Sequence, residues 1–261
     1  MSEQRQDRQQ QLQKERQQER QQDGGLHEED QARADFYALF ARLLLAPPDA
    51  ALLAALAHAD PIAAVGEFAL EDAWLGLTQA AGVVDARAAA DEFDLLFIST
   101  GTPLLNPYGS FYLTGHLNDV PLAELRHDLA VLRLARAPGS GEFEDHLGAL
   151  CETMRVLIQG GPGAAPRPLP AQKAFFETHL RPWYAACLAD IAGTEGSNFY
   201  RVVARVVDAF LSIEAQAFAV LDPLDPALDP LTGQPRQPRA DLRHALPASD
   251  PDLRADTTLT A

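Results

Sequence analysis

Cysteine is scarce in this sequence, and so are patterns that bind metals. The chain has two cysteines, Cys151 and Cys187, each alone in a stretch of helical periodicity without a CxxC pair. Buried thiols are therefore favoured over a disulfide or a metal site. The seven histidines add no ligand pattern, because none has a partner at the HExxH spacing. We expect no metal and no cofactor.

Positive charge and long apolar runs are scarce as well. The formal net charge is −16, and no central stretch is rich in lysine or arginine, so the protein should repel nucleic-acid phosphates. No run of about 18 apolar residues occurs, and the hydrophilic N-terminus lacks the apolar stretch of a secretory signal. The sequence predicts no nucleic-acid binding, no stable membrane insertion and a cytoplasmic location. An acidic surface would also steer a basic peptide toward the protein.

Patterns typical of enzymes are missing too. No segment alternates with a period of two, and neither G-x-G-x-x-G nor GKS/T is present. Ser110 does not lie in the G-x-S-x-G elbow of a serine hydrolase. Asp145 and His146 form the single weak acid–base candidate. We therefore predict that the protein is not an enzyme, with an enzyme as one alternative.

The middle of the chain is instead dominated by helical periodicity. Apolar residues at three-and-four spacing predict a first helix that ends at Pro47-Pro48. Asp119 and Pro121 resemble the capped start of another helix, and Pro182 predicts a kink or a fresh start. Further helices are expected over 50–58, from about 61 to 82, over 85–98, from 140–143 to 160, and along 176–191 and 203–218. The fold class is therefore all-α, with a single globular helical domain.

Both ends of the chain differ from this middle region. Residues 1–30 are rich in glutamine and contain no aromatic residue, so we expect a disordered or loosely helical segment. Residues 221–261 contain a proline every few positions and are expected to form an extended tail. The folded domain is predicted to span residues 31–220.

An aromatic-rich segment, LLFISTGTPLLNPYGSFYLTGHL at 95–117, reads as the end of a helix followed by a loop. It belongs to a set of four motifs in a fixed order: E-F-D-L-L-F at 92–97, N-P-Y-G-S-F-Y-L at 106–113, E-D-H-L at 144–147 and F-F-E-T-H-L-R-P-W at 175–183. In this order the motifs resemble the TorD/DmsD family of cytoplasmic redox-enzyme maturation chaperones, also called twin-arginine proofreading chaperones.

This resemblance implies a TorD-like helical bundle that acts as a system-specific chaperone. Such a protein binds the twin-arginine signal peptide of a molybdopterin-dependent oxidoreductase subunit and holds the subunit back from export until its cofactor is inserted. Tyr108 stands where relatives often have tryptophan, and Glu144 where many have proline. The family's peptide-binding residues map onto Leu96, Phe97, Pro107, Tyr108, Gly109, Ser110, Tyr112, Asp145 and His146.

The chemistry of this residue set suits a peptide with two guanidinium groups followed by an apolar segment. Aromatic rings at 97, 108, 111 and 112 would supply an apolar and cation–π wall, and Asp145 would accept an arginine. The same rings would equally serve as core packing, and an acidic first turn at 142–145 would cap a helix. His146 would alternatively be a structural donor that closes the loop against the helix.

Two further alternatives stay open at the level of the sequence. One is a non-catalytic adaptor or assembly factor for a redox-enzyme complex that is not exported, acting through the glutamine-rich segment. The other concerns the oligomeric state, because the glycine-rich loops at 139–141 and 160–163 could act as hinges for the exchange of helices between two copies. The chain is thus expected to be a monomer or a homodimer.

Overall fold

The computed structural model describes residues 28–62, 66, 68–98, 103–136, 141–221, 227–229 and 231–235. These residues form ten α-helices, one π-helix and no strand, which confirms the predicted all-α class. Most of the two predicted tails, and the glycine-rich segment 139–140, lie outside the described residues. Within the predicted C-terminal tail, the described residues 227–229 and 231–235 include a hydrogen-bonded turn, and Leu231 is buried.

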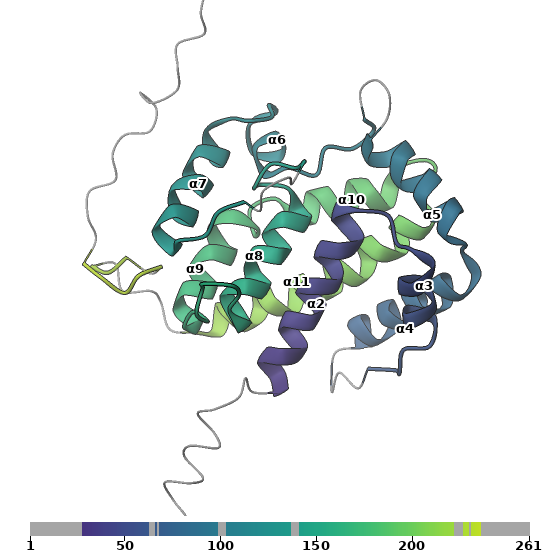
Figure 1. Ribbon diagram of the computed structural model, residues 1–261, viewed down its shortest axis with the longest axis horizontal. Coiled ribbons are helices and arrows are strands. Elements are labelled where there is room, and N and C mark those ends of the chain that lie inside the picture. The colour runs from purple at the N-terminus through teal and green to yellow at the C-terminus, as the bar shows by residue number, and fades with distance from the viewer. Residues whose placement is uncertain are drawn as a thin grey trace, which may run out of the picture.

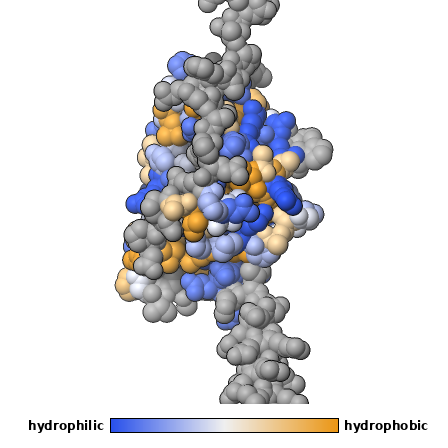
Figure 2. Space-filling model, turned by 90° about the vertical axis from the view of Figure 1, so that its left-hand side faces the viewer, coloured by the Kyte–Doolittle hydropathy of each residue, from blue (hydrophilic) through white to orange (hydrophobic). Residues whose placement is uncertain are grey.

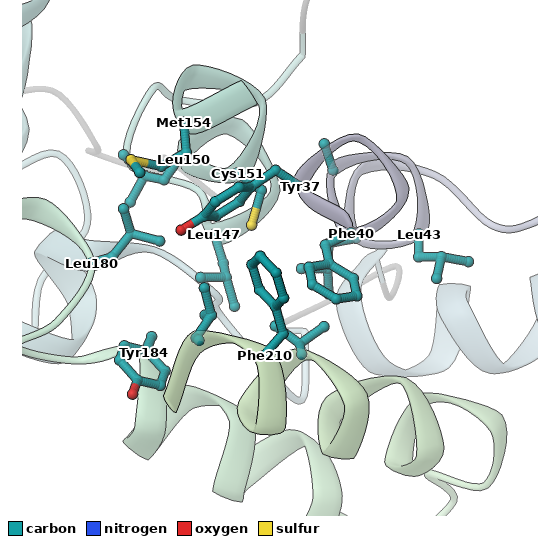
Figure 3. Close-up of a cluster of buried hydrophobic side chains, with 14 of the residues drawn as sticks. Tyr37, Phe40, Leu43, Leu147, Leu150, Cys151, Met154, Leu180, Tyr184 and Phe210 are labelled. Carbon is teal, nitrogen blue, oxygen red and sulfur yellow. The ribbon is translucent and has the colours of Figure 1, made fainter. Parts of the chain in front are cut away.

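Three helices form the centre of the domain: α2 (Glu28–Leu45), α8 (Leu147–Gln159) and α11 (Phe199–Val220). Helix α2 packs most extensively against α8. Figure 3 shows side chains of α2, α8 and α11 converging on one cluster of buried rings, aliphatic groups and the thiol of Cys151. The rings of Tyr37 and Phe40 both meet Phe210 edge-on, with centroids 5.1 and 5.4 Å apart. This cluster is the core that supports the rest of the fold.

The other helices lie at the two ends of this centre (Figure 1). One end holds α3 (Ala50–Ala57), α4 (Phe68–Val83), α5 (Ala86–Phe93) and the π-helix η1 (Asp94–Ile98). The opposite end holds α6 (Gly109–Thr114), α7 (Val120–Leu132) and α9 (Leu169–His179), while α10 (Tyr184–Gly193) packs along α11.

Several helix boundaries follow directly from the sequence. Helix α7 has Asp119 as its N-cap, with a carboxylate oxygen 2.7 Å from the amide nitrogen of Val120, and Pro121 in its first turn. The stripe from 176 to 191 is divided at Leu180–Trp183, as expected from Pro182, and α2 ends before Pro47. These predictions are confirmed because each depends on local backbone chemistry.

Three local predictions were wrong. Pro61 does not begin a helix, since α4 starts at Phe68. Residues 109–114 form α6 within the segment expected to be a loop. The helix expected from 140–143 begins only at Leu147, so the acidic residues 142–145 precede it. Their carboxylates bond groups distant in sequence, described below, and their backbone forms a single turn closed by the His146 N–H and the Phe143 carbonyl at 3.1 Å.

The first motif also acquires a structural explanation. Glu92, on α5, accepts hydrogen bonds from the backbone N–H groups of Asn198, Phe199 and Tyr200 at 2.8 to 3.0 Å. These groups begin α11 and have no acceptor within their own helix, so the carboxylate caps the positive end of the longest helix. Glu92 thereby fixes the end of α5, and with it η1, against α11.

Candidate functional site

Two of the motifs meet in space through backbone hydrogen bonds. Tyr108 and His146 form an isolated antiparallel β-bridge. Next to it, the Gly109 N–H donates to the carbonyl of Asp145 at 2.9 Å, and the Leu147 N–H donates to the carbonyl of Pro107 at 2.8 Å. The bridge holds the start of α6 against the start of α8, although the two segments are separated in sequence by all of α7.

Asp145 strengthens this junction with its side chain. One carboxylate oxygen accepts a hydrogen bond from the Ser110 N–H at 2.8 Å, which caps α6 from another segment of the chain. Asp145 is 3% exposed and Ser110 is completely buried. Within the described residues, the second carboxylate oxygen of Asp145 and the Ser110 hydroxyl lack a hydrogen-bond partner. The pair is therefore a buried polar junction between α6 and the loop before α8.

His146 is the N-cap of α8, and its ring acts as an acceptor. The Gly148 N–H donates to Nδ1 at 3.0 Å, which requires a neutral ring with its proton on Nε2. Burial lowers the pKa of His146 to about 4, so the ring stays neutral near pH 7. His146 was expected to be a structural hydrogen-bond donor, and the structure shows that its ring accepts the bond instead. The bond still closes the loop against the helix.

Tyr108 covers the bridge with its ring. Its centroid lies 5.0 Å from that of His146 and 6.2 Å from that of Phe143, both in edge-on geometry. Its hydroxyl donates to a carboxylate oxygen of Glu142. Burial, with Glu142 and Asp145 nearby, raises the pKa of Tyr108 well above its usual value, so the phenol remains protonated. The half-buried ring forms part of the protein surface beside the bridge.

Tyr112 lies on the other side of α6, against the break between α9 and α10. Its ring stacks on Trp183 with centroids 5.6 Å apart and planes inclined by 21°, and its hydroxyl donates to Asp190 at 2.9 Å. A Cβ atom at Gly109 would lie 3.1 Å from Trp183 Nε1. Glycine at 109 thus permits the close approach of α6 to the indole.

Leu96 and Phe97 occupy a separate place in the fold. Leu96 is completely buried in η1, and its carbonyl accepts a hydrogen bond from the Leu105 N–H at 3.0 Å. Phe97 packs against Phe93 and Tyr200 at centroid distances of 5.1 and 5.2 Å. Among the described residues, no hydrogen bond or ring contact joins Phe97 to the bridge. The structure therefore brings the predicted residues 107–110 together with Asp145 and His146. Leu96 and Phe97 lie apart from them.

A pocket of about 880 Å³ is lined by Glu142 and Phe143, the two residues that contact the hydroxyl and the ring of Tyr108. Its walls come from the end of α7, the outer face of α8, the loop before α8 and residues 161–164. Most of the wall is apolar, with Phe143 next to the Tyr108 ring. The charged part of the lining consists of glutamates at 142, 144 and 152 and arginines at 133, 136 and 155. Sequence analysis placed Glu142 in a helical turn and assigned no role to Phe143. The sequence signal that could have indicated them is the acidic Glu142 directly before the aromatic Phe143, close to the E-D-H-L motif.

Other classes of site find little support in the described part of the chain. No group of three or more histidine, cysteine, aspartate or glutamate side chains there is arranged to hold a metal ion. None of the described helices combines the length and apolar character needed to cross a membrane. On the face seen in Figure 2, hydrophobic patches alternate with strongly hydrophilic ones. This face is thus mixed in character.

Comparison with known sequences gives a family match. A search of curated proteins gave no match. The family model of the nitrate reductase delta subunit matches residues 67–189, a range that contains all four of the ordered motifs. That family consists of non-catalytic chaperones for the maturation of molybdoenzymes. The match spans 123 of the 261 residues and supports the resemblance of this chain to the TorD/DmsD-like family of redox-enzyme maturation chaperones.

Proposed function

We propose that this protein binds the twin-arginine signal peptide of a molybdopterin-dependent oxidoreductase subunit in the cytoplasm. It retains the subunit until the cofactor is inserted and then releases it for export. The observation that carries the proposal is the pocket next to the Tyr108–His146 bridge, where apolar walls and carboxylates lie side by side. A peptide with guanidinium groups followed by an apolar segment needs both kinds of surface.

The predicted site residues divide into two roles by their burial. Tyr108, Tyr112 and Phe97 are partly exposed and supply contact surface for the peptide. The buried members position that surface, because their hydrogen bonds join α6 to the loop before α8 and their side chains fill the core beneath it. These buried members are Pro107, Gly109, Ser110, Asp145 and His146, whereas Leu96 is buried in η1, away from this junction.

The proposal is tested by recovering the partner from the protein's own host. The tagged full-length chain is purified from cells grown under oxygen limitation, and bound proteins are identified by mass spectrometry. We expect one dominant molybdoenzyme subunit that carries an uncleaved twin-arginine leader.

Tyr108→Ala should weaken binding of the recovered leader by about 1–3 kcal/mol, the range for loss of an aromatic anchor. Binding is measured by calorimetry on a variant whose melting temperature is checked first. Phe68→Ala serves as control, because Phe68 is 77% exposed on α4 at the opposite end of the domain. An equal loss of affinity in both variants would remove Tyr108 from the binding surface.

A second function is favoured by the family description, which names a subunit of nitrate reductase. In that case the protein is an assembly factor for a redox-enzyme complex that is not exported. The recovered partner distinguishes the two, because this function predicts a molybdoenzyme subunit without a twin-arginine leader.

A further inference from the structure

We infer that Glu142 is the carboxylate that receives an arginine of the bound peptide, and that the Tyr108 hydroxyl occupies this acceptor in the free protein. The inference rests on the proposed function and assigns the arginine to one residue of the pocket. It replaces the expectation that Asp145 accepts the arginine, because Asp145 is buried and already bonds the Ser110 N–H.

The argument begins with the three carboxylates that line the pocket. Glu144 pairs with Arg126 at 2.9 Å, and Glu152 pairs with Arg155 through two hydrogen bonds of 2.6 and 2.8 Å. Both are therefore neutralised by a guanidinium of the chain itself. The side chain of Glu142 differs, since its hydrogen-bond partner is the neutral phenol of Tyr108. Within the described residues, Glu142 is thus the pocket carboxylate whose charge lacks a direct cationic partner.

The position of the nearest arginines supports this assignment. Arg136 donates to the backbone carbonyl of Glu142 at 3.0 Å, and so it fixes the loop without bonding the carboxylate. Arg133 is exposed at the C-terminal cap of α7, in a left-handed conformation with φ of 59°. Both cations line the same pocket, and within the described residues neither forms an ion pair with the Glu142 carboxylate. The charge of that carboxylate is therefore left for an incoming cation.

The geometry around Glu142 suits a guanidinium in particular. One oxygen of Glu142 accepts from Tyr108, and the other has no hydrogen-bond partner within the described residues. A guanidinium bonds both oxygens of a carboxylate at once, whereas an ammonium acts as a point charge. The Tyr108 ring lies beside the carboxylate and offers a face on which a planar cation stacks, whereas the guanidinium of Arg126 already lies 5.9 Å from the centroid of the Phe143 ring. The site should therefore prefer arginine to lysine.

The experiment measures this preference by fluorescence anisotropy with the full-length protein. One labelled probe carries two consecutive arginines followed by an apolar segment of leucine and alanine, and the second carries two lysines in their place. The wild-type protein should bind the arginine probe about tenfold more tightly than the lysine probe.

Glu142→Gln should weaken binding of the arginine probe by about tenfold or more and make the two affinities similar. Tyr108→Phe, which retains the ring and frees the carboxylate, should bind the arginine probe as tightly as the wild type or more tightly. Glu152→Gln is the matched control, since it removes the same charge from the same pocket at a residue already paired with Arg155. It should keep the preference.

The outcomes separate the inference from the function on which it rests. If the wild type prefers the arginine probe and Glu142→Gln keeps that preference, the assignment to Glu142 is wrong while the chaperone function stands. Equal losses in Glu142→Gln and Glu152→Gln would show a general effect of charge, which also overturns the assignment. If the wild type binds neither probe, the proposed function fails together with the inference.

Discussion

At the scale of single residues, the aspartate and histidine of the E-D-H-L motif hold the fold together at the site. The Asp145 side chain caps α6, and the His146 side chain caps α8. The backbones of the two residues form the bridge to the N-P-Y-G-S segment. Substitutions here will change stability before they change recognition. Binding measurements on such variants need a matched measurement of folding.

His146 should make stability depend on pH. Its pKa is near 6.5 when unfolded and about 4 when folded, so the unfolded chain takes up a proton that the folded chain resists. The free energy of unfolding should therefore be fully retained above pH 6.5. It should fall by about 1.4 kcal/mol per pH unit as the pH decreases from about 6.5 to about 4. Urea denaturation at a series of pH values measures this slope.

His146→Asn is the control for this dependence, because asparagine caps a helix without titrating. Carboxylates also titrate in acid, so the quantity to compare is the difference in the free energy of unfolding between the wild type and His146→Asn. That difference should shrink as the pH falls through this window. A difference that does not vary with pH would mean that the folded state accommodates a protonated His146.

At the scale of secondary structure elements, the packing of α2 against α8 depends on a single glycine. A Cβ atom at Gly148 would lie 2.8 Å from Leu45 Cγ, closer than such carbon atoms approach, and 3.1 Å from Leu44 Cβ, which is a tight contact. Since Gly148 also donates to His146, the contact lies directly beneath the site. The approach of these two helices therefore positions the start of α8.

Gly148→Ala should destabilise the domain by about 1–3 kcal/mol, because the added methyl group forces α2 and α8 apart. Gly76→Ala offers the opposite case within α4, where the nearest atom would be Val202 Cγ1 at 3.7 Å. Relief of the glycine entropy cost should stabilise that variant by about 0.5–1 kcal/mol. Chemical denaturation of both variants measures the contrast. A stable Gly148→Ala protein would show that the two helices separate at little cost.

Comparing elements also shows what the sequence could and could not predict. Helix α7 was predicted at its start because Asp119 and Pro121 act on their own backbone. The start of α8 was misplaced because acidic residues 142–145 look like a helical first turn. They are in fact bonded to Tyr108, Arg126 and Ser110. Such partners are set by tertiary structure, and local pattern carries no record of them.

The same contrast between local and tertiary contacts explains how much of the candidate site could be predicted from the sequence. The bridge joins two of the four ordered motifs, and the part that these residues play in binding stays a prediction. The particular status of Glu142 depends on its bond to Tyr108 and on the pairing of Glu144 with Arg126, which join residues far apart in the sequence. The sequence does not specify these two contacts locally, whereas Glu152 and Arg155 lie three positions apart on α8.

At the scale of the whole molecule, the net charge of −16 should attract a peptide that carries arginines. The Debye length falls from about 10 Å at 0.1 M salt to about 3 Å at 1 M. Over this range, the association rate of the arginine probe should drop by about tenfold or more. The dissociation rate should change less, because apolar contact is not screened. Stopped-flow anisotropy gives both rates. An association rate insensitive to salt would exclude electrostatic steering.

The stack of Tyr112 on Trp183 gives the protein an intrinsic optical reporter. The chain has two tryptophans, and the other, Trp74, packs against Phe36 near the opposite end of the domain. A Trp74→Phe variant therefore emits from one indole alone, in contact with α6. Movement of α6 during peptide capture would alter the environment of that indole. The emission wavelength and lifetime would then report the event in unlabelled protein.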